Sequence, residues 1–509
     1  MPIQGTDGYI IVAGPQGWGG EQSDWPADLI AVPFLSATDA VYHDGPELLR
    51  RQGEFREPSA AASASMNIVA GVAANYNSPG QKILIQGSNG RFYHTSAGMN
   101  SWTAVGTSAF GQPATFAMLG DFLAICTDGG QLLGCSGTDH VWAIDAGLTG
   151  VSAAPRARFV TTYKNRLWAC GHNASADEVR YTAIGPTTGL PTVTDWYSTG
   201  NAGNRIFAQG EGFRLIGVAA DKDQWYAFKR NRVLAVTGAT PASFVTVEAD
   251  REWGPYHRSV AIVGRGLIGA NEEGIASVLD GKVEPLLPNR LLKWWQTLNL
   301  ANVSAFQGAW SGARNQYRLS VQNADLTWAM LTGVLEPGKP ISWYRWAVPA
   351  YCLFPRFVGG NRLDFYRGGS ADGFLYRMDQ SNQDASANYT ASFRTGILDD
   401  GKPWLDKIFR WAWVLGRARG PFNLSATFTV HDEDGKPTPV GRRTRLFDAT
   451  SAASGPFNPD VKRASFTLDG SYGWGVDVQV DFEPSSAGSI HKIVIGYDLA
   501  DREGHGRAR

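Results

Sequence analysis

The feature that most restricts the fold is a repeat in the middle of the chain. Between about residues 80 and 380, an apolar strand, a turn that mostly contains Gly, and a second apolar or aromatic strand recur roughly every 40 residues, the period of a four-stranded propeller blade. The repeated units are residues 82–96, 120–137, 163–185, 223–238, 264–281, 313–331 and 362–379. They predict an all-β chain with a β-propeller over residues 81–385. About seven blades fit this length, and six or eight also fit.

Turn and core residues of the units agree with this prediction. Asn89-Gly90 suits a tight hairpin, because a type I′ turn needs positive φ at both of its central residues. The chain contains 60 Gly and 18 Trp, a composition typical of short strands and tight turns rather than long helices. Aromatic residues at alternate strand positions would fill the wedges between blades: Phe92, Trp168, Trp225 and Tyr376.

The regions outside the repeat predict two further parts and one insertion. Residues 1–80 are expected to hold an N-terminal segment and the first blade. Residues 386–509 contain longer strand-like runs, and their alternation predicts a C-terminal β-sandwich-like domain. The clearest alternation is in Val476, Val478, Val480 and Phe482. A short helix is expected as an insertion over residues 289–300, with Asn289 as its N-cap.

Charge and cysteine content exclude several classes of protein. The formal net charge is −1, so no strongly basic field is present to hold a phosphate backbone by bulk attraction. The N-terminus lacks the basic and apolar regions of a signal peptide, and no apolar run approaches the ~20 residues of a membrane span. The sequence predicts a protein made in the cytoplasm without a membrane span. The cysteines match no zinc or Cys-x-x-Cys spacing, which predicts reduced, buried thiols at Cys126, Cys135, Cys170 and Cys352.

No motif indicates catalysis, and we expect no catalytic, cofactor-binding or metal-binding residues. The eight His are scattered without metal-ligand spacing, and no nucleophile elbow or phosphate-binding loop is present. The enzymatic alternative is a carbohydrate-binding or glycoside-cleaving β-propeller, which needs two carboxylates opposed across the sugar. Acidic residues of β proteins more often solvate turns. The candidate carboxylates are Asp221, Asp223, Asp250, Glu252, Glu272 and Glu273.

One basic cluster, Lys229-Arg230-Asn231-Arg232, lies between two apolar, aromatic-rich runs. Basic residues in a hairpin turn are usually solvated and also discourage edge-to-edge strand pairing. In the alternative interpretation, Lys229, Arg230 and Arg232 contact DNA passing through a channel, or a neighbouring subunit. A sequence-specific DNA reader is not indicated, because the sequence has no recognition helix, zinc finger or basic stripe.

Three segments in succession resemble a known family. They are "YKNRLWACGHNASADEVRYTAIG" at 163–185, "DWYSTG" at 195–200 and "GEGFRLIGVAADKDQWYAFKRNRVLAVTGAT" at 210–240. The succession resembles the propeller-bearing tail hub, or nozzle, proteins of short-tailed bacteriophages, once named packaged-DNA stabilisation proteins. The resemblance is firmest over residues 156–280.

The hairpin at residues 224–240 resembles a blade hairpin of that family. The matching positions are the pair Phe228-Lys229, then Val233-Leu234, then Gly238. The resemblance therefore implies that this stretch is a strand–turn–strand unit of one blade. The basic residues would occupy its turn, and none of the matching motifs is catalytic.

The resemblance implies a structural virion protein rather than an enzyme. In this family six copies form a ring below the portal and its adaptor. The ring extends the DNA conduit, retains the packaged DNA and carries the tail needle or fibres, and DNA leaves through it at infection. The expected location is the virion tail, after synthesis in the host cytoplasm.

The resemblance also implies the partners. They are other copies of the chain in a hexameric ring, the head-to-tail adaptor, the tail needle or fibres, and phage double-stranded DNA in transient, non-specific contact. A ring needs two different faces of one subunit. The β-sandwich-like domain and the insertion at 289–300 are the candidate faces. Another phage structural role, such as a head-completion, baseplate or fibre-linked protein, also fits the sequence.

Overall fold

The computed structural model describes most of the chain. The described residues are 8–12, 35–39, 41–44, 47–58, 60–76, 80–95, 100–107, 113–127, 132–135, 142–143, 156–171, 177–183, 202–206, 214–264, 266–279, 282–359, 362–369, 371–381, 389, 391–418, 422–432, 434–447, 462–482 and 488–500. In this part, seven four-stranded sheets and two larger sheets contain the strands. No helix among these residues is long and apolar enough to cross a membrane.

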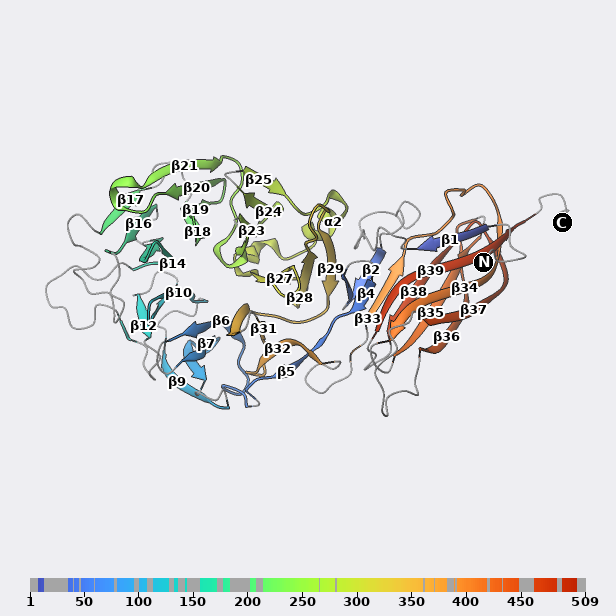
Figure 1. The fold of residues 1–509 in the computed structure, drawn as a ribbon, viewed down its shortest axis with the longest axis horizontal. Helices are drawn as coiled ribbons and strands as arrows, with labels where there is room; N and C mark the ends of the chain where they lie inside the picture. The colour runs from blue at the N-terminus through green and yellow to red at the C-terminus, as the bar shows by residue number, and fades with distance from the viewer. Residues whose placement is uncertain are drawn as a thin grey trace.

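The seven four-stranded sheets are the blades of a propeller (Figure 1). Blade 1 contains β6 (Ile68–Asn75), β7 (Gln81–Gly87), β8 (Arg91–Thr95) and β9 (Trp102–Thr107). Blade 2 contains β10 (Thr115–Leu119), β11 (Phe122–Cys126), β12 (Leu133–Cys135) and β13 (Trp142–Ala143). Blade 3 contains β14 (Phe159–Tyr163), β15 (Arg166–Cys170), β16 (Glu178–Tyr181) and β17 (Gly203–Ile206). Blade 4 contains β18 (Leu215–Ala220), β19 (Trp225–Lys229), β20 (Arg232–Thr237) and β21 (Val245–Asp250).

The remaining blades complete the ring. Blade 5 contains β22 (Ala261–Val263), β23 (Gly266–Asn271), β24 (Gly274–Leu279) and β25 (Lys282–Pro285). Blade 6 contains β26 (Gln307–Ser311), β27 (Gln316–Gln322), β28 (Trp328–Val334) and β29 (Ser342–Trp346). Blade 7 contains β30 (Leu353–Gly359), β31 (Arg362–Gly368), β32 (Leu375–Ser381) and, from the N-terminal part, β5 (Gly53–Arg56). The prediction of an all-β chain with a propeller of about seven blades is confirmed.

The first strand of each blade lies toward the propeller axis. These strands contact one another from β30 through β6, β10 and β14 to β18, and from β22 through β26 back to β30. The second strands have their apolar side chains buried on both faces, as in β11 and β15, because neighbouring blades cover them. Trp168 and Trp225 stack with their ring centroids 4.8 Å apart, so aromatic residues do fill the wedge between blades 3 and 4.

Blade 7 is closed by a strand from the N-terminal part of the chain. β5 pairs antiparallel with β32, and Arg56 lies opposite Tyr376. The buried carboxylate of Glu54 accepts a hydrogen bond from Arg367 at 2.7 Å between Oε2 and Nε, and a second one from Nη2. This pairing differs from the expected division, in which residues 1–80 hold the first blade. The first blade is β6–β9, and β5 completes the seventh blade because only there does it find a partner strand.

Two larger sheets form a second domain beside the propeller (Figure 1). One sheet has the order β2 (Leu35–Asp39), β33 (Ala391–Thr395), β38 (Gly475–Phe482), β35 (Phe422–His431) and β36 (Pro437–Phe447). The other has the order β3 (Val41–Asp44), β4 (Glu47–Arg50), β39 (Gly488–Leu499), β34 (Lys407–Ala418) and β37 (Lys462–Gly473), with β1 (Gly8–Val12) also paired to β39. The two-sheet domain therefore takes four strands from the N-terminal part, which the expected domain of residues 386–509 does not include.

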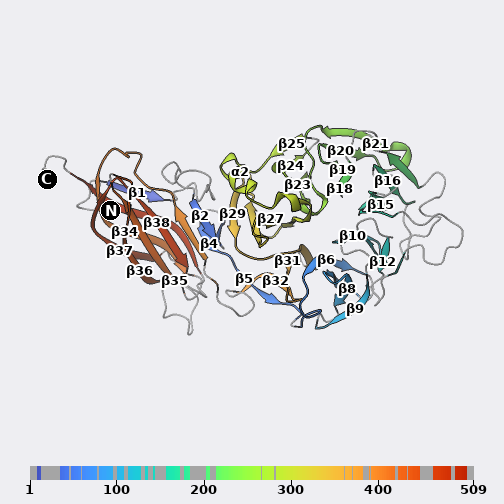
Figure 2. The same cartoon turned by 180° about the vertical axis from the view of Figure 1, so that it is seen from behind.

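The two sheets share one apolar core. Their buried side chains belong to a single cluster, and the rings of Phe428 on β35 and Phe466 on β37 lie 5.3 Å apart. The alternating apolar residues of β38 are buried, as predicted, and between them Gln479 is exposed and Asp481 half-buried, whereas Asp477 is buried. The same cluster of buried residues continues into blades 6 and 7 of the propeller. In both views, β2 and β4 lie on the side of the two-sheet domain that faces the propeller (Figures 1 and 2).

Trp346, at the end of β29, joins the two domains. Its side chain is buried, its Nε1 donates to the Val41 carbonyl of β3 at 2.8 Å, and its ring centroid lies 6.3 Å from that of Tyr42. On the propeller side, the Arg318 guanidinium lies 5.1 Å from the Trp346 ring and pairs with Asp379 at 2.8 Å. The propeller and the two-sheet domain are thus connected by a packed, hydrogen-bonded contact as well as by the chain.

The expected helical insertion lies between blades 5 and 6. The helix α2 (Asn289–Gln296) begins where it was expected, but Pro288 is the N-cap, and no side-chain capping bond is present. The helix ends at Gln296, and a 3-10 helix, η4 (Leu300–Ala305), follows. Trp295 anchors α2, because its buried Nε1 donates to the Glu272 carbonyl at 3.1 Å.

Three of the four cysteines are described with their side chains. Cys126, Cys170 and Cys352 are free and buried, as predicted. Burial raises the pKa of the Cys352 thiol to about 12, which keeps it protonated and unreactive near neutral pH. The side chain of Cys135 lies outside the described part.

Glu54→Ala should destabilise the ring closure strongly. The change leaves the buried Arg367 guanidinium without its carboxylate, and removing one partner of a buried ion pair costs about 3–5 kcal/mol. The control is Lys339→Ala, which removes an exposed lysine from its pair with the half-buried Glu336 and should cost no more than about 1 kcal/mol. The measurement is urea unfolding followed by Trp fluorescence. Equal losses in the two variants would contradict a stabilising role of this pair.

Candidate functional site

The basic cluster expected at the hairpin turn is mostly engaged within the subunit. β19 and β20 pair with Lys229 opposite Arg232, so residues 224–240 do include a blade hairpin. The Lys229 side chain is 0% exposed, and its Nζ lies 3.1 Å from Asp177 Oδ1. Arg230 pairs with Glu272 at 3.2 Å and is the most exposed of the three, and Arg232 pairs with Glu248 at 2.9 Å. Only Arg230 therefore presents much of its guanidinium to a partner.

Three of the six candidate carboxylates of the enzymatic alternative serve turns or an ion pair. Asp221 Oδ1 accepts the backbone N–H groups of residues 223 and 224, both at 2.7 Å. Asp250 Oδ1 accepts those of residues 252 and 253, both at 2.8 Å. Glu272 accepts a hydrogen bond from the Tyr256 hydroxyl at 2.8 Å and pairs with Arg230. None of the six candidates belongs to the described lining of the cavity at the propeller axis.

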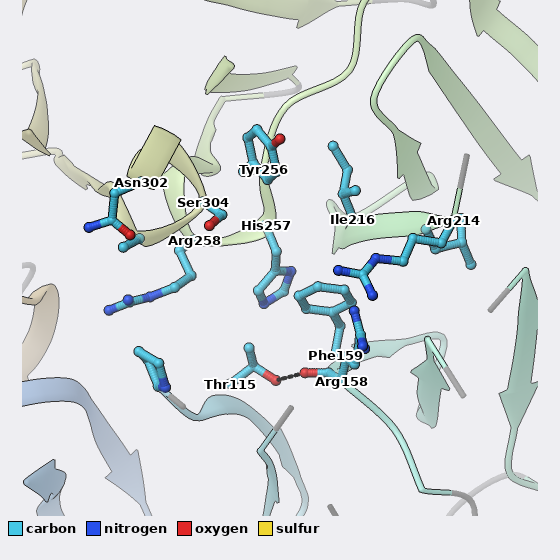
Figure 3. Close-up of a pocket in the computed structure, with 13 residues that line it drawn as sticks. Thr115, Arg158, Phe159, Arg214, Ile216, Tyr256, His257, Arg258, Asn302 and Ser304 are labelled. Atoms are coloured by element: carbon cyan, nitrogen blue, oxygen red, sulfur yellow. Dashed lines mark hydrogen bonds between the residues drawn. The ribbon is translucent and has the colours of Figure 1, made fainter. Parts of the chain in front are cut away.

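That cavity is the strongest candidate site. It has a volume of about 190 Å³. Its lining comes from the starts of successive first strands and the connections that lead into them (Figure 3). Because every first strand runs in the same direction along the axis, these starts meet at one end of the propeller. The lining residues are Pro113, Thr115, Arg158, Phe159, Arg214, Leu215, Ile216, Tyr256, His257, Arg258, Asn302, Ser304 and Ala305. We call this cavity the axial pocket.

A short 3-10 helix, η3 (His257–Ser259), lies beside the pocket and contacts β18 of blade 4, β23 of blade 5 and β26 of blade 6. Ser259 holds it in place, because its carbonyl accepts the buried Tyr317 hydroxyl at 2.6 Å and its hydroxyl bonds to Ala270. The neighbouring blades come very close to η3. A Cβ added at Gly308 would lie 2.1 Å from the Ser259 carbonyl oxygen, and one at Gly217 would lie 2.7 Å from His257 Cα. Glycine at these two positions therefore leaves the space that η3 needs between the neighbouring blades.

Arg258 extends from η3 across the axis. Its Nη2 donates to the Val69 carbonyl of blade 1 at 2.5 Å and to Gln307 Oε1 of blade 6 at 2.8 Å. Both acceptors are neutral, and no carboxylate among the described residues pairs with this guanidinium. Burial lowers its pKa to about 10, which still leaves Arg258 charged at neutral pH. The axis therefore holds a fixed, partly buried positive charge.

His257 forms the centre of the pocket wall. Its Nδ1 lies 2.7 Å from the Val218 carbonyl oxygen, and its ring packs against Phe159 with centroids 4.9 Å apart. Burial lowers its pKa to about 4, and the nearby Arg258 acts in the same direction. His257 is therefore neutral at physiological pH and adds no charge to the pocket.

Two further arginines face the same space. In Figure 3, Arg214 points toward Phe159 and Arg158, whereas Arg258 extends in the opposite direction. Arg214 is exposed and Arg158 is half-buried. None of the thirteen described lining residues is Asp or Glu. The axial pocket thus gathers three cations in a subunit whose net charge is −1.

The sequence contains a pattern that indicates this site: the positions of three arginines relative to the strands of the repeat. Arg158, Arg214 and Arg258 each stand at or just before the first strand of a blade, in three consecutive blades. Aligning the repeats by their strands, rather than by their turns, would have placed all three at one end of the axis. The sequence instead predicted a contact site at the basic cluster in the hairpin turn, because the charges of that cluster are adjacent in the sequence.

Comparisons with known proteins find only remote likeness. No family model matches the chain, and no curated protein matches it. The crystal structure of BamB from Moraxella catarrhalis is 13% identical, covers 67% of this chain and 94% of its own, and has a TM-score of 0.39. YCF48 from Cyanidioschyzon merolae is 13% identical, covers 62% and 96%, and has a TM-score of 0.35. The computationally designed Ika8 protein is 11% identical, covers 64% and 99%, and has a TM-score of 0.37. Likeness at this level carries no argument about function.

Lys229→Ala and Arg230→Ala should differ sharply in stability. Lys229→Ala leaves Asp177 without a buried partner and should lower the free energy of unfolding by about 3 kcal/mol. Arg230→Ala removes a largely exposed pair and should change it by no more than about 0.5 kcal/mol. Chemical denaturation of both variants and the wild type measures the difference. A small loss for Lys229→Ala would mean that this lysine is not buried in the subunit.

His257→Asn should weaken the pH dependence of stability. The folded pKa of about 4 lies below the ordinary value of 6.5. Below pH 6.5 the unfolded chain therefore takes up a proton that the folded chain does not, and stability is lost as the pH falls toward 4. Asn keeps a hydrogen-bonding group near the position of Nδ1 without this titration. Denaturant midpoints of both proteins between about pH 7 and pH 4 give the two slopes, and identical slopes would refute the assignment.

Proposed function

We propose that the chain is a structural protein of a short-tailed phage virion, a tail hub or nozzle subunit. Several copies, most simply six, form a ring that continues the DNA conduit below the portal and adaptor. The ring retains the packaged genome and serves its ejection. The expected contacts are the neighbouring copies, the adaptor, the tail needle or fibres, and DNA in transient passage.

The observation that carries this proposal is the joint between the two domains. A ring subunit has to present two different faces of one body to its neighbours. Here the propeller and the two-sheet domain share an apolar core, and Trp346 bonds across the joint. Strands from the N-terminal part belong to both domains, since β1–β4 lie in one and β5 lies in the other. This arrangement suits a subunit that transmits load rather than one that opens and closes.

The resemblance in the sequence gives the proposal its specific form. The segment 210–240 includes the first three strands of blade 4, and 163–185 includes the middle strands of blade 3. The segment 195–200 lies outside the described residues. The two described segments therefore belong to consecutive blades, which is the order expected for homologous propeller repeats.

The position of Arg258 at the propeller axis bears on where DNA would pass. The Arg258 side chain reaches from η3 to blades 1 and 6 and so crosses the axis of the propeller. The conduit of this proposal therefore lies at the centre of the ring, between subunits. A near-neutral subunit suits such a wall, because strong phosphate contacts would hold DNA that has to slide. Of the candidate carboxylates of the glycoside-cleaving alternative, Asp221 and Asp250 cap turns and Glu272 forms an ion pair, and this favours the structural role over that alternative.

Electron microscopy of the purified chain should show ring assembly. We expect rings with an open axis, either from the chain alone or after mixing with the portal–adaptor complex of the same virus. Light scattering of the same samples gives the mass and hence the number of copies. The control is an unrelated portal–adaptor complex, which should recruit no rings. A monodisperse monomer that does not bind the cognate complex would rule out the hub role.

A further inference from the structure

The axial pocket has the composition of a binding site for a small anion. Arg158, Arg214 and Arg258 line a cavity of about 190 Å³, and the described lining holds no acidic side chain. Like charges that share a cavity repel one another, and a concave site of one sign concentrates ions of the opposite sign. A small oxyanion is the kind of ligand that such a concave, positively charged site attracts.

The three arginines differ in what they offer to a ligand. Arg258 donates to Val69 and Gln307, and it stands beside the pocket as a fixed charge. Arg214 is exposed, and its guanidinium points into the space next to Phe159 and Arg158 (Figure 3). A guanidinium presents paired N–H groups that match the two oxygens of a carboxylate or phosphate.

The rest of the wall limits the kind of ligand. Phe159 and Tyr256 provide aromatic surface, and the hydroxyls of Thr115 and Ser304 are part of the lining. The volume is below the range of about 300–1,000 Å³ typical of pockets for drug-sized ligands. The Arg258 side chain reaches from η3 across the axis beside the pocket, where it is bonded to blades 1 and 6.

We propose that the axial pocket binds the carboxylate or phosphate group of a small molecule, such as a sugar acid or a phosphate monoester. Arg214 and Arg158 face the anionic group, Arg258 supplies fixed positive charge, and the aromatic walls contact the rest of the ligand. The proposal adds a ligand site to a subunit whose assembly depends on other surfaces. Failure of one proposal therefore leaves the other intact.

Titration calorimetry of the full chain with inorganic phosphate and with glucuronate tests the proposal. We expect one site per chain in a low-chloride buffer at neutral pH. Arg214→Gln should weaken binding at least about tenfold, because it removes a charge-assisted contact. The matched control is Arg251→Gln, which changes an arginine on blade 4 that is 79% exposed and lies outside the pocket. This control should leave the affinity unchanged, and circular dichroism verifies that both variants fold.

The outcomes separate the sources of the anion. Binding of phosphate alone, of glucuronate alone, or of both supports the site and assigns its ligand to phosphate esters, sugar acids or oxyanions in general. Absence of binding up to about 10 mM of either probe overturns the proposal, as does an unchanged affinity in Arg214→Gln. A short DNA duplex is the third ligand. If the duplex binds in a manner that depends on Arg214 and neither small anion binds, the small-anion proposal is also overturned, and the pocket is instead part of a contact with a polyanion.

Discussion

Closure of the propeller by β5 is the constraint on which the rest of the structure depends. β5 is the outer strand of blade 7, so its pairing with β32 covers the outer edge of β32 and completes the last blade, and the buried pair of Glu54 and Arg367 fixes the strand in place. The same N-terminal segment supplies β1–β4 to the two-sheet domain. The propeller, from β5 to β32, is a contiguous piece of the sequence that is inserted between the N-terminal strands β1–β4 and the C-terminal strands β33–β39 of the two-sheet domain. One apolar core runs from β35 and β37 to Trp346 and joins the two domains.

The axial pocket shows how a repeat can build a site from residues that are far apart in the chain. Each blade brings the start of its first strand to the same end of the axis. One residue from each of several blades can therefore face the same small space. Arginine at three such positions produces a cationic pocket, and glycine at 217 and 308 leaves room for η3. The scaffold supplies the convergence, and a few side chains determine its chemistry.

The sequence predicted what depends on local pairing and missed what depends on distant partners. Blades 1–6 pair each strand with the next, so their repeat is visible in the chain. The distant partners of β1, β2, β4 and β5 are not, because alternation in a strand tells which face is buried but not which strand lies beside it. Turn chemistry was also only partly predictable. Of Asn89-Gly90 only Gly90 has positive φ, whereas Lys164-Asn165 has it at both positions without any glycine. The pocket arginines were missed because their neighbours in space are blades apart in sequence.

Ring closure also has a consequence for synthesis of the chain on the ribosome. Arg377 of β32 bonds to Glu57, just after β5 and 320 residues away. At a typical rate of 5–20 residues per second, β5 waits roughly 16–64 s for its partner to be made. Until then its strand edge is open, as are those of β1, β2 and the β3–β4 hairpin, whose partners β33 and β39 come later still. The nascent N-terminal segment is therefore the part of this protein that most needs a chaperone, and slow codons late in the gene would prolong its exposure.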